Sequence, residues 1–147
     1  MNDERRQVDP QGAFPSEGLR EVERNALRVL RCMPGAGLSR TRDVIQAELW
    51  GEEGIVVLVT AEAFEIRLPT IEWTMGAYGP ADASRLWKRV RADALSDGQL
   101  LDLIEAGLEA RRAEFVACRF CGRLFPVEHR SGDACHDCAS RHLGIVY

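Results

Sequence analysis

The chain is poor in lysine and contains no long apolar segment. Lys88 is the single lysine among 19 basic residues, and no apolar run approaches the roughly 18 residues of a membrane-spanning helix. The N-terminal region also lacks the basic stretch, apolar run and small-residue cleavage site of a secretory signal. These absences predict a protein without a membrane span that works in the reducing cytoplasm.

Common catalytic motifs are missing as well. The chain has no G-x-S-x-G nucleophile elbow, no P-loop and no dinucleotide-binding glycine fingerprint. The acids of its alternating segments, Glu62, Glu65 and Glu72, fit the solvent-facing side of strands. Cys32 has no histidine or second thiol near it in sequence, which favours a buried apolar role over that of a nucleophile. The sequence therefore favours a non-enzymatic protein.

Composition and charge indicate a small acidic body with a distinct C-terminal part. The 147 residues suffice for one small domain with a metal-stabilised appendage, and 46% hydrophobic with 29% charged residues is typical of globular chains. Residues 1–110 hold 13 basic and 19 acidic groups, whereas residues 111–147 hold 6 arginines and 4 acids. The acidic body disfavours capture of nucleic acid by a broad positive surface.

The most informative pattern is a pair of C-x-x-C motifs near the C-terminus, separated by 13 residues. Its members are Cys118, Cys121, Cys135 and Cys138. Two such pairs supply the four thiolates that tetrahedral Zn²⁺ favours, and Gly122 after the first pair suits the tight turn that directs both sulfurs at one metal. A structural zinc site is therefore predicted.

Two other chemistries compete for these cysteines. Disulfides are disfavoured in the reducing setting predicted above. Rubredoxin-type iron sites usually carry a glycine after each pair, whereas Ala139 follows the second pair here. Zinc is the favoured interpretation.

Helical periodicity opens an α+β body that is expected over residues 16–115. Residues 1–15 mix charges with proline and glycine, have no sustained apolar period, and are expected to form a flexible arm. From Ser16, which fits the N-cap position, apolar residues recur at steps of three and four until Pro34. This spacing predicts an amphipathic helix.

The period then shortens to two, which predicts strands. Between Asp43 and Met75 apolar and polar residues alternate, so an antiparallel meander of three to four strands is expected. A helix over residues 41–50 is the alternative for the first segment, because Glu, Ala and Leu favour helices. Pro69 makes residues 70–74 either an edge strand or a bent continuation.

Two further helices are expected before the cysteines. Residues 84–90 fit a short helix that buries Trp87. Its charged side carries Arg85, Lys88, Arg89 and Arg91. Solvation accounts for most such clusters, and contact with phosphate is the alternative. Ser96 and Gln99 form a capping box for a longer helix that ends near Phe115 and leads straight to the metal module.

Residues 116–147 are expected to form that module, a four-cysteine zinc finger. The residues between the two cysteine pairs fit a turn followed by a short hairpin. Asp133 can cap a helix that starts near Ala134 and ends at Gly144, which would make the module a treble clef. A strand in place of that helix would make it a zinc ribbon, and both possibilities stay open.

The string CRFCGRLFP…CHDCA resembles the four-cysteine finger of DksA/TraR-type transcription factors, and it is similar to treble-clef and zinc-ribbon fingers generally. The resemblance covers a small part of the chain, and it implies zinc binding and an association with transcription through RNA polymerase. That family has a longer gap between the cysteine pairs and a long coiled coil before them, which this chain lacks. The whole chain is also similar to small bacterial proteins of unknown activity that end in such a finger.

Three histidines lie within the module, at positions 129, 136 and 142. Four thiolates already complete a structural zinc site, so these histidines are expected at the surface or beside the ligands. HNH nucleases carry a histidine on the hairpin of a treble clef, and Glu128 and His129 occupy that region. The downstream Asn and His of such an enzyme are missing, which disfavours nuclease activity.

The segment from Leu68 to Pro80 places Trp73 and Tyr78 among glycines, a composition typical of recognition loops. Packing of both rings over the core is the commoner arrangement. With a closed metal site and no catalytic motif, the sequence predicts a zinc-binding, non-enzymatic interaction module with a protein partner. The alternative is a nucleic-acid-binding or transcription-associated protein whose finger contacts phosphate. The candidate contacts are Arg119, Arg123, Arg130 and Arg141.

Overall fold

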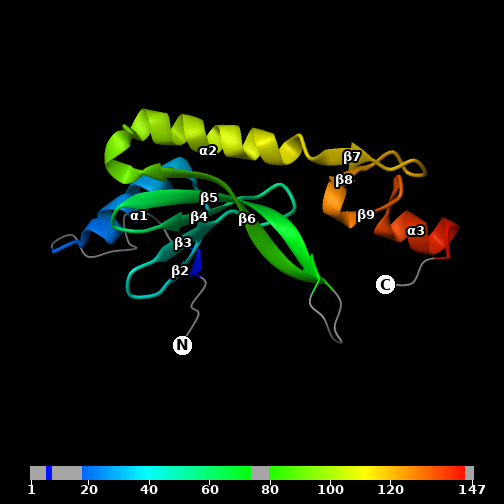
Figure 1. Cartoon of the computed structure of the whole chain (residues 1–147), viewed down its shortest axis with the longest axis horizontal. Coiled ribbons are helices and arrows are strands. Elements are labelled where there is room, and N and C mark those ends of the chain that lie inside the picture. Colours follow the sequence, from blue (N-terminus) through cyan, green and yellow to red (C-terminus); the bar gives the residue numbers. More distant parts are fainter. Residues whose placement is uncertain (1–5, 8–17, 74–79, 145–147) are drawn as a thin grey trace.

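The computed structural model describes residues 6–7, 18–73 and 80–144. An antiparallel sheet carries two helices on one face, and a small finger lies beyond the end of the second helix (Figure 1). Within the described residues, no helix is both long and apolar enough to cross a membrane. The predicted α+β class, with a cysteine-rich module after the body, is confirmed.

In the part of the chain that the structure describes, the main sheet has six strands, and their order in the sheet is their order along the chain. The strands are β1 (Arg6–Gln7), β2 (Gly37–Arg40), β3 (Ile45–Glu48), β4 (Val56–Val59), β5 (Ala63–Trp73) and β6 (Pro80–Arg91). Every neighbouring pair is antiparallel, which confirms the meander and the strand interpretation of residues 45–48. The sheet exceeds the predicted three to four strands, partly because residues 6 and 7 of the predicted arm pair with β2.

The predicted helix over residues 84–90 is wrong, because this segment belongs to β6. The register between β5 and β6 shifts at Ile66 and Arg67, so that Trp87 is an extra residue with no partner of its own on β5. Such a bulge shifts the alternation of side chains by one position. Trp87 and Val90, three positions apart, therefore both pack against the core from a strand. The bulge reproduces the three-residue spacing of a helix, which explains the wrong prediction.

Strand β5 runs through Pro69 without a break, so the continuation predicted as one alternative is the observed arrangement. β4 pairs with β5 only between Phe64 and Arg67. Beyond Arg67 the strand has β6 as its single neighbour among the described strands, and proline is tolerated at such positions. The long β5–β6 hairpin projects past the rest of the sheet (Figure 1).

The two long helices are α1 (Glu21–Cys32) and α2 (Asp97–Arg112), with the short 3₁₀ helix η1 (Ala92–Ala94) before α2. α1 begins later than predicted, since Gly18 adopts a φ of 71° and the Glu23 carboxylate accepts the Arg20 N–H at 3.2 Å. The predicted capping box of α2 is confirmed. Ser96 Oγ accepts the Gln99 N–H at 3.1 Å, and the Gln99 side chain accepts the Ser96 N–H at 2.9 Å.

One hydrophobic core lies between the helices and the sheet. Val29 and Leu30 of α1 and Leu100 and Ile104 of α2 are almost completely buried against strand residues such as Phe64. Burial of this kind contributes about 1.5–3 kcal/mol per large side chain. This packing holds α2 firmly across the sheet, and the end of α2 determines where the finger starts.

The finger follows α2 directly. Its elements are β7 (Phe115–Ala117), β8 (Leu124–Pro126), the 3₁₀ helix η2 (Val127–His129), β9 (Arg130–Ser131), β10 (Ala134–Cys135) and α3 (His136–His142). β7 pairs with β8, and β9 pairs with β10, both antiparallel. The expected turn, hairpin and helix are all present in that order.

Candidate metal centre

The first cysteine pair sits in a tight turn between β7 and β8. The Cys118 N–H donates to the Arg123 carbonyl at 2.9 Å, and the Gly122 N–H donates to the Cys118 carbonyl at 2.9 Å. Gly122 adopts a φ of 73°, a conformation that costs glycine little. Gly122 therefore lets the chain turn tightly after the first cysteine pair, which is the role expected of it. The turn directs the Cys118 side chain into the finger, where it is buried, and leaves Cys121 exposed.

The second pair lies where β10 passes into α3. Cys135 occupies the N-cap position of α3, and Cys138 lies in its first turn. Asp133, the predicted cap, instead pairs with Arg119: its carbonyl accepts the Arg119 N–H at 2.9 Å, and its carboxylate lies 3.5 Å from the guanidinium. The helix therefore begins two residues later than predicted, and Asp133 ties the second pair to the first.

All four sulfurs lie within 4.8 Å of one another. A metal ion bound at about 2.3 Å to four tetrahedral sulfurs would separate them by about 3.8 Å, so the group is of a size that one ion can hold. The Cys135 N–H donates to Cys118 Sγ at 3.4 Å. A small apolar cluster surrounds the group, with Phe125, Ala134 and Ala139 buried beside the cysteines. Donor chemistry and spacing both fit a metal ion.

Neighbouring groups move the pKa values of Cys118 and Cys138 in opposite directions. Burial alone would raise the pKa of Cys118, but N–H groups of Cys121, Cys135 and Phe120 lower it to about 6. Burial and the other cysteines raise the pKa of Cys138 well above its usual range. Four thiols in so small a space cannot all lose their protons, because the negative charges repel. A divalent cation would reverse that balance by attracting all four thiolates.

The three histidines lie outside this group. The His129 and His136 rings stack at 5.7 Å, His129 Nδ1 lies 3.5 Å from a Glu52 carboxylate oxygen, and the His142 ring stacks on Phe120 at 4.6 Å. Among the described residues, the four cysteines are the one group of three or more side chains placed to share a metal. His129 and His136 are half-buried and His142 is exposed, which agrees with the expected positions at the surface or beside the ligands.

The four cations predicted beside Trp87 have partners within the fold. Arg85 pairs with Glu114, Arg89 with Glu65 at 3.4 Å, and Arg91 with Asp93 at 2.9 Å. The Lys88 ammonium lies over the Trp87 ring at 4.9 Å. These internal contacts reduce the charge that this strand offers to phosphate.

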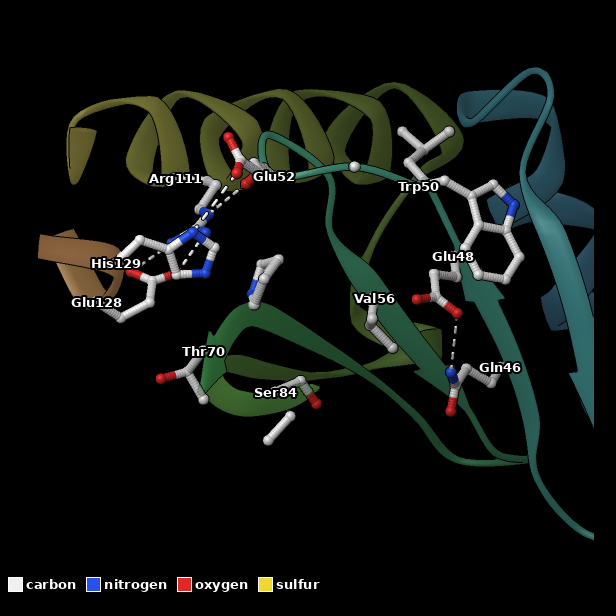
Figure 2. Close-up of a pocket in the computed structure, with 14 residues that line it drawn as sticks. Gln46, Glu48, Trp50, Glu52, Val56, Thr70, Ser84, Arg111, Glu128 and His129 are labelled. Carbon is white, nitrogen blue, oxygen red and sulfur yellow. Dashed lines mark hydrogen bonds and ion pairs between the residues drawn. The ribbon is translucent and has the colours of Figure 1, made fainter. Parts of the chain in front are cut away.

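The finger and the body together line a pocket of about 480 Å³, which the sequence did not predict (Figure 2). Strand β3 and the loop after it form one side, and the β5–β6 hairpin forms another. Arg111, Glu128 and His129 close the end at the finger. Residues from three distant parts of the chain therefore meet in one cavity.

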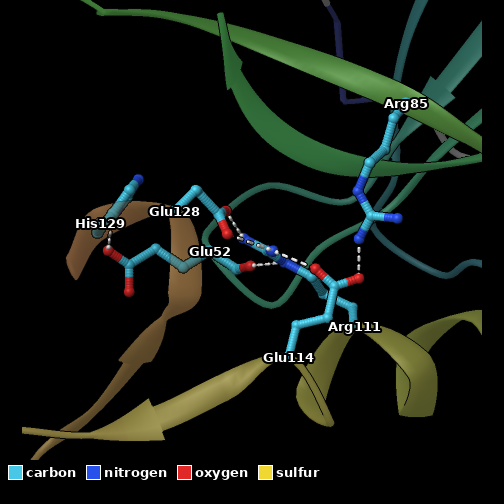
Figure 3. A network of polar contacts seen from close by, with 6 residues as sticks. All are labelled: Glu52, Arg85, Arg111, Glu114, Glu128 and His129. Atoms are coloured by element: carbon cyan, nitrogen blue, oxygen red, sulfur yellow. Dashed lines mark hydrogen bonds and ion pairs between the residues drawn. The ribbon is translucent and has the colours of Figure 1, made fainter. Parts of the chain in front are cut away.

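Arg111 joins the finger to the body (Figure 3). Its side chain is 1% exposed, and its Nε–H donates to the Glu52 carbonyl at 2.7 Å. The two terminal nitrogens donate to the two Glu128 oxygens at 2.6 and 3.2 Å, and one also donates to Glu114 at 3.2 Å. This pairing keeps the pKa of Glu128 below its usual value although burial alone would raise it.

The sequence contains a pattern that could have indicated the buried position of Arg111. Leu100, Ile104, Gly107 and Arg111 recur at steps of four, three and four, and all are buried on one side of α2. The arginine therefore occupies an apolar stripe of the helix. A charge at such a position indicates a buried partner.

The predicted recognition segment from Leu68 to Pro80 is described in part, because residues 74–79 lie outside the described residues. Trp73 is the last residue of β5, and Tyr78 lies outside the described residues. The docking role of these two rings stays a prediction.

Comparisons with protein-family models, with curated proteins and with solved structures found no match to this chain. The geometry of the finger and of its junction with the body therefore provides the basis for a function.

Proposed function

We propose that the chain is a zinc-binding, non-enzymatic interaction module of the cytoplasm with a protein partner. In this proposal Cys118, Cys121, Cys135 and Cys138 hold one structural Zn²⁺ in a treble-clef finger. The observation that carries it is the gathering of four sulfurs within 4.8 Å, three of them on buried cysteines. Four thiolates fill a tetrahedral zinc site and leave no position for substrate, so the metal acts as a structural element.

The order of elements supports the treble-clef type. A glycine-assisted turn between β7 and β8 bears the first pair, the short β9–β10 hairpin follows, and a helix begins at the second pair. The finger has a small core of its own, so the metal would supply much of its folding free energy. A rigid attachment through Arg111 suits a module that presents a surface to a partner.

Exposed apolar side chains support a protein partner. Phe120, Leu124 and Leu143 of the finger are all exposed, and Leu124 reaches 63%. Apolar and aromatic side chains dominate binding energy at protein interfaces, whereas phosphate recognition needs unpaired cations. Arg119 and Arg141 of the finger are paired with Asp133 and Asp137. The nucleic-acid alternative retains Arg123 and Arg130, which are exposed.

Metal analysis tests the zinc assignment. Protein purified without added metal should contain one zinc per chain, and Cys121→Ser should lower that content strongly because it removes one of four ligands. Cys32→Ser is the matched control, since Cys32 lies in α1 and packs against the body core. Negligible zinc in the unmodified protein, with free thiols or disulfides instead, would refute the assignment.

Partner type is tested by capture from a native lysate at increasing salt. A protein interface that rests on apolar contacts should tolerate salt, whereas contacts with several phosphates would weaken steeply. Prior digestion of nucleic acid in half of the lysate is the control. Loss of all captured material after digestion would favour the nucleic-acid alternative over the proposal.

A further inference from the structure

The four sulfurs of the finger differ in their access to solvent. Cys118, Cys135 and Cys138 are each 3% exposed and lie within the small apolar cluster of the finger. Cys121 is exposed, and the residues on both sides of it in the chain are exposed as well. A dissolved reagent therefore reaches one of the four cysteines before the other three. Accessible thiolates with a second thiol close by are the cysteines that peroxides oxidise most readily.

The turn that bears Cys121 keeps Cys118 beside it. Two backbone bonds close this turn, from the Cys118 N–H to the Arg123 carbonyl and from the Gly122 N–H to the Cys118 carbonyl, both at 2.9 Å. Neither bond uses an atom of the second cysteine pair, so the turn does not depend on that pair. Because only two residues separate the two cysteines, each thiol stays at a high effective concentration near the other.

The second pair is tied to the first by fewer contacts. The Cys135 N–H donates to Cys118 Sγ at 3.4 Å, and Arg119 meets Asp133 through one backbone bond at 2.9 Å and one exposed ion pair at 3.5 Å. Exposed ion pairs contribute little. Phe125 is the largest side chain of the apolar cluster. A metal ion shared by both pairs would therefore supply most of the attraction between them.

Loss of that attraction would reach the junction with the body through Phe125. This ring packs in the same cluster as the cysteines, and Glu128 follows it by three residues, in the segment formed by β8 and η2. Glu128 in turn accepts bonds from both terminal nitrogens of Arg111, at 2.6 and 3.2 Å. If the cluster comes apart, the segment that carries Glu128 loses its anchor, and its bidentate pairing with Arg111 weakens.

We infer that the finger is a peroxide-sensitive switch, in which a disulfide between Cys121 and Cys118 releases the metal and loosens the finger from the body. The inference rests on the proposed zinc site and names how that site is regulated. The co-reactant is an oxidant of the hydroperoxide class, such as hydrogen peroxide. The reduced finger keeps the surface that the proposed partner binds, and the oxidised finger loses it.

Two steps account for all atoms and electrons. The Cys121 thiolate attacks a peroxide oxygen, so that an S–O bond forms, the O–O bond breaks, and the departing hydroxide takes up a proton to become water. The Cys118 thiolate then attacks the Cys121 sulfur, which forms the S–S bond and expels a second hydroxide, again protonated to water. Two thiolates, one peroxide and two protons thus give one disulfide and two waters. The two remaining cysteines are too few to complete a structural zinc site.

The first test follows metal and thiols in the intact, zinc-analysed protein. Hydrogen peroxide should release the zinc, which a colorimetric chelator detects. Peptide mass spectrometry without reduction should then locate a disulfide between Cys118 and Cys121. Reductant added together with zinc should restore the starting protein. Retention of zinc in peroxide, oxidised sulfurs without a disulfide, or a disulfide between other cysteines would overturn the inference.

Two exchanges of a ligand for histidine give a matched pair of variants. Histidine binds zinc but forms no disulfide, so Cys121→His and Cys138→His should both retain zinc. Peroxide should release zinc from Cys121→His about tenfold more slowly than from the unmodified protein, because the accessible thiolate is gone. Cys138→His keeps the first pair intact and should release zinc at least as fast as the unmodified protein. Equal rates in the two variants would refute the role of Cys121.

The order of alkylation in the unmodified protein gives the same answer without a substitution. A small alkylating reagent added to the zinc-loaded protein should modify Cys121 before the three buried cysteines of the finger. Earlier modification of any of those three would refute the role of Cys121, whether or not the histidine variants bind zinc.

Hydrogen exchange tests the link to the body. In the disulfide form, protection should fall across residues 125–129, whereas β4 and β5 should keep theirs because they belong to the body core. Unchanged protection across residues 125–129 would refute the effect on the junction. Metal analysis before peroxide is added separates this inference from the proposed function. Absence of zinc at that stage refutes both, whereas zinc that stays bound in peroxide refutes the switch alone.

Discussion

Arg111 places a full positive charge inside the protein. Removing such a charge from water costs several kcal/mol, and its attraction to partners offsets this cost only when the geometry is good. Here Glu128 accepts two bonds, Glu114 accepts one and the Glu52 carbonyl accepts another. The arrangement specifies how the finger meets the body, because a shifted finger would leave the guanidinium without its bidentate partner.

A double-mutant cycle measures this specificity. Glu128→Ala should destabilise the protein by about 2–3 kcal/mol, since it leaves a buried charge partly unpaired. In combination with Arg111→Met the further loss should be much smaller, which gives a coupling energy of about 1–3 kcal/mol in urea unfolding. Glu105→Ala on the exposed side of α2 is the control, with an expected change within about 0.5 kcal/mol. If the effects of Glu128→Ala and Arg111→Met on the unfolding free energy are strictly additive, the contact between these two residues contributes nothing to stability.

Glu23 provides a pH-dependent contribution at the other end of the body. Burial alone would raise its pKa, but the Arg20 N–H, the Arg20 guanidinium and Arg40 lower it. Its folded pKa therefore lies below the unfolded value of about 4.3. The stability that it contributes is present above that value and is lost as the pH falls through the folded pKa.

Glu23→Gln should remove this dependence. The difference in unfolding free energy between the unmodified protein and the variant should stay constant above about pH 5, and it should shrink steadily on acidification below about pH 4.3. Urea unfolding of both proteins at matched pH values provides the measurement, and any loss of metal in acid affects both alike. If the difference in unfolding free energy between the two proteins does not vary with pH, Glu23 does not make the pH-dependent contribution to stability.

At the scale of elements, local signals predicted most of the body. The capping box of Ser96 and Gln99 starts α2 as expected, because both partners lie within one turn. The bulge at Trp87 could not be anticipated, since it depends on the pairing of β6 with β5. Short apolar patterns are ambiguous whenever an extra residue alters the alternation of a strand.

Packing of α2 on that bulge can be tested with two glycines of the same helix. A Cβ at Gly107 would lie 3.2 Å from Ile66 and 3.3 Å from Trp87, whereas one at Gly98 would have 3.9 Å to its nearest neighbour. Alanine favours helix by about 0.8–1 kcal/mol over glycine, and overpacking costs about 1–3 kcal/mol. Gly98→Ala should therefore stabilise the protein slightly, and Gly107→Ala should destabilise it by about 1 kcal/mol. Thermal unfolding of both variants measures these changes in stability. If both substitutions stabilise the protein, the sheet must shift to make room for the added methyl group.

For the whole molecule, the cysteine group was predictable and its surroundings were not. C-x-x-C pairs are local, and a turn of four residues brings their sulfurs together wherever the pair occurs. The junction joins Glu52, Arg111 and Glu128, which are separated by 59 and 17 residues along the chain. Contacts of such separation depend on the completed fold, so neither the pocket nor the junction followed from spacing alone.

Removal of the metal should affect the two parts of the molecule differently. A strong chelator should unfold residues 116–144, because structural zinc in small fingers supplies about 10–16 kcal/mol of apparent binding free energy. The body has its own core and should keep its protection in hydrogen exchange at β4, β5 and the first half of α2. Chelator already saturated with zinc is the control. If the whole finger keeps its hydrogen-exchange protection after chelation, its own packing is sufficient to keep it folded without metal.

The order of the strands has a consequence for synthesis on the ribosome. Each strand of the sheet pairs with the strand made just before it, so the body can assemble from its N-terminal side while translation continues. Arg111 then emerges 17 residues ahead of Glu128, an interval of roughly 1–3 s at ordinary rates of elongation. During that interval the growing chain carries an arginine whose bidentate partner does not yet exist. Folding of the finger therefore also completes the contacts of the body, because it supplies the bidentate partner of Arg111.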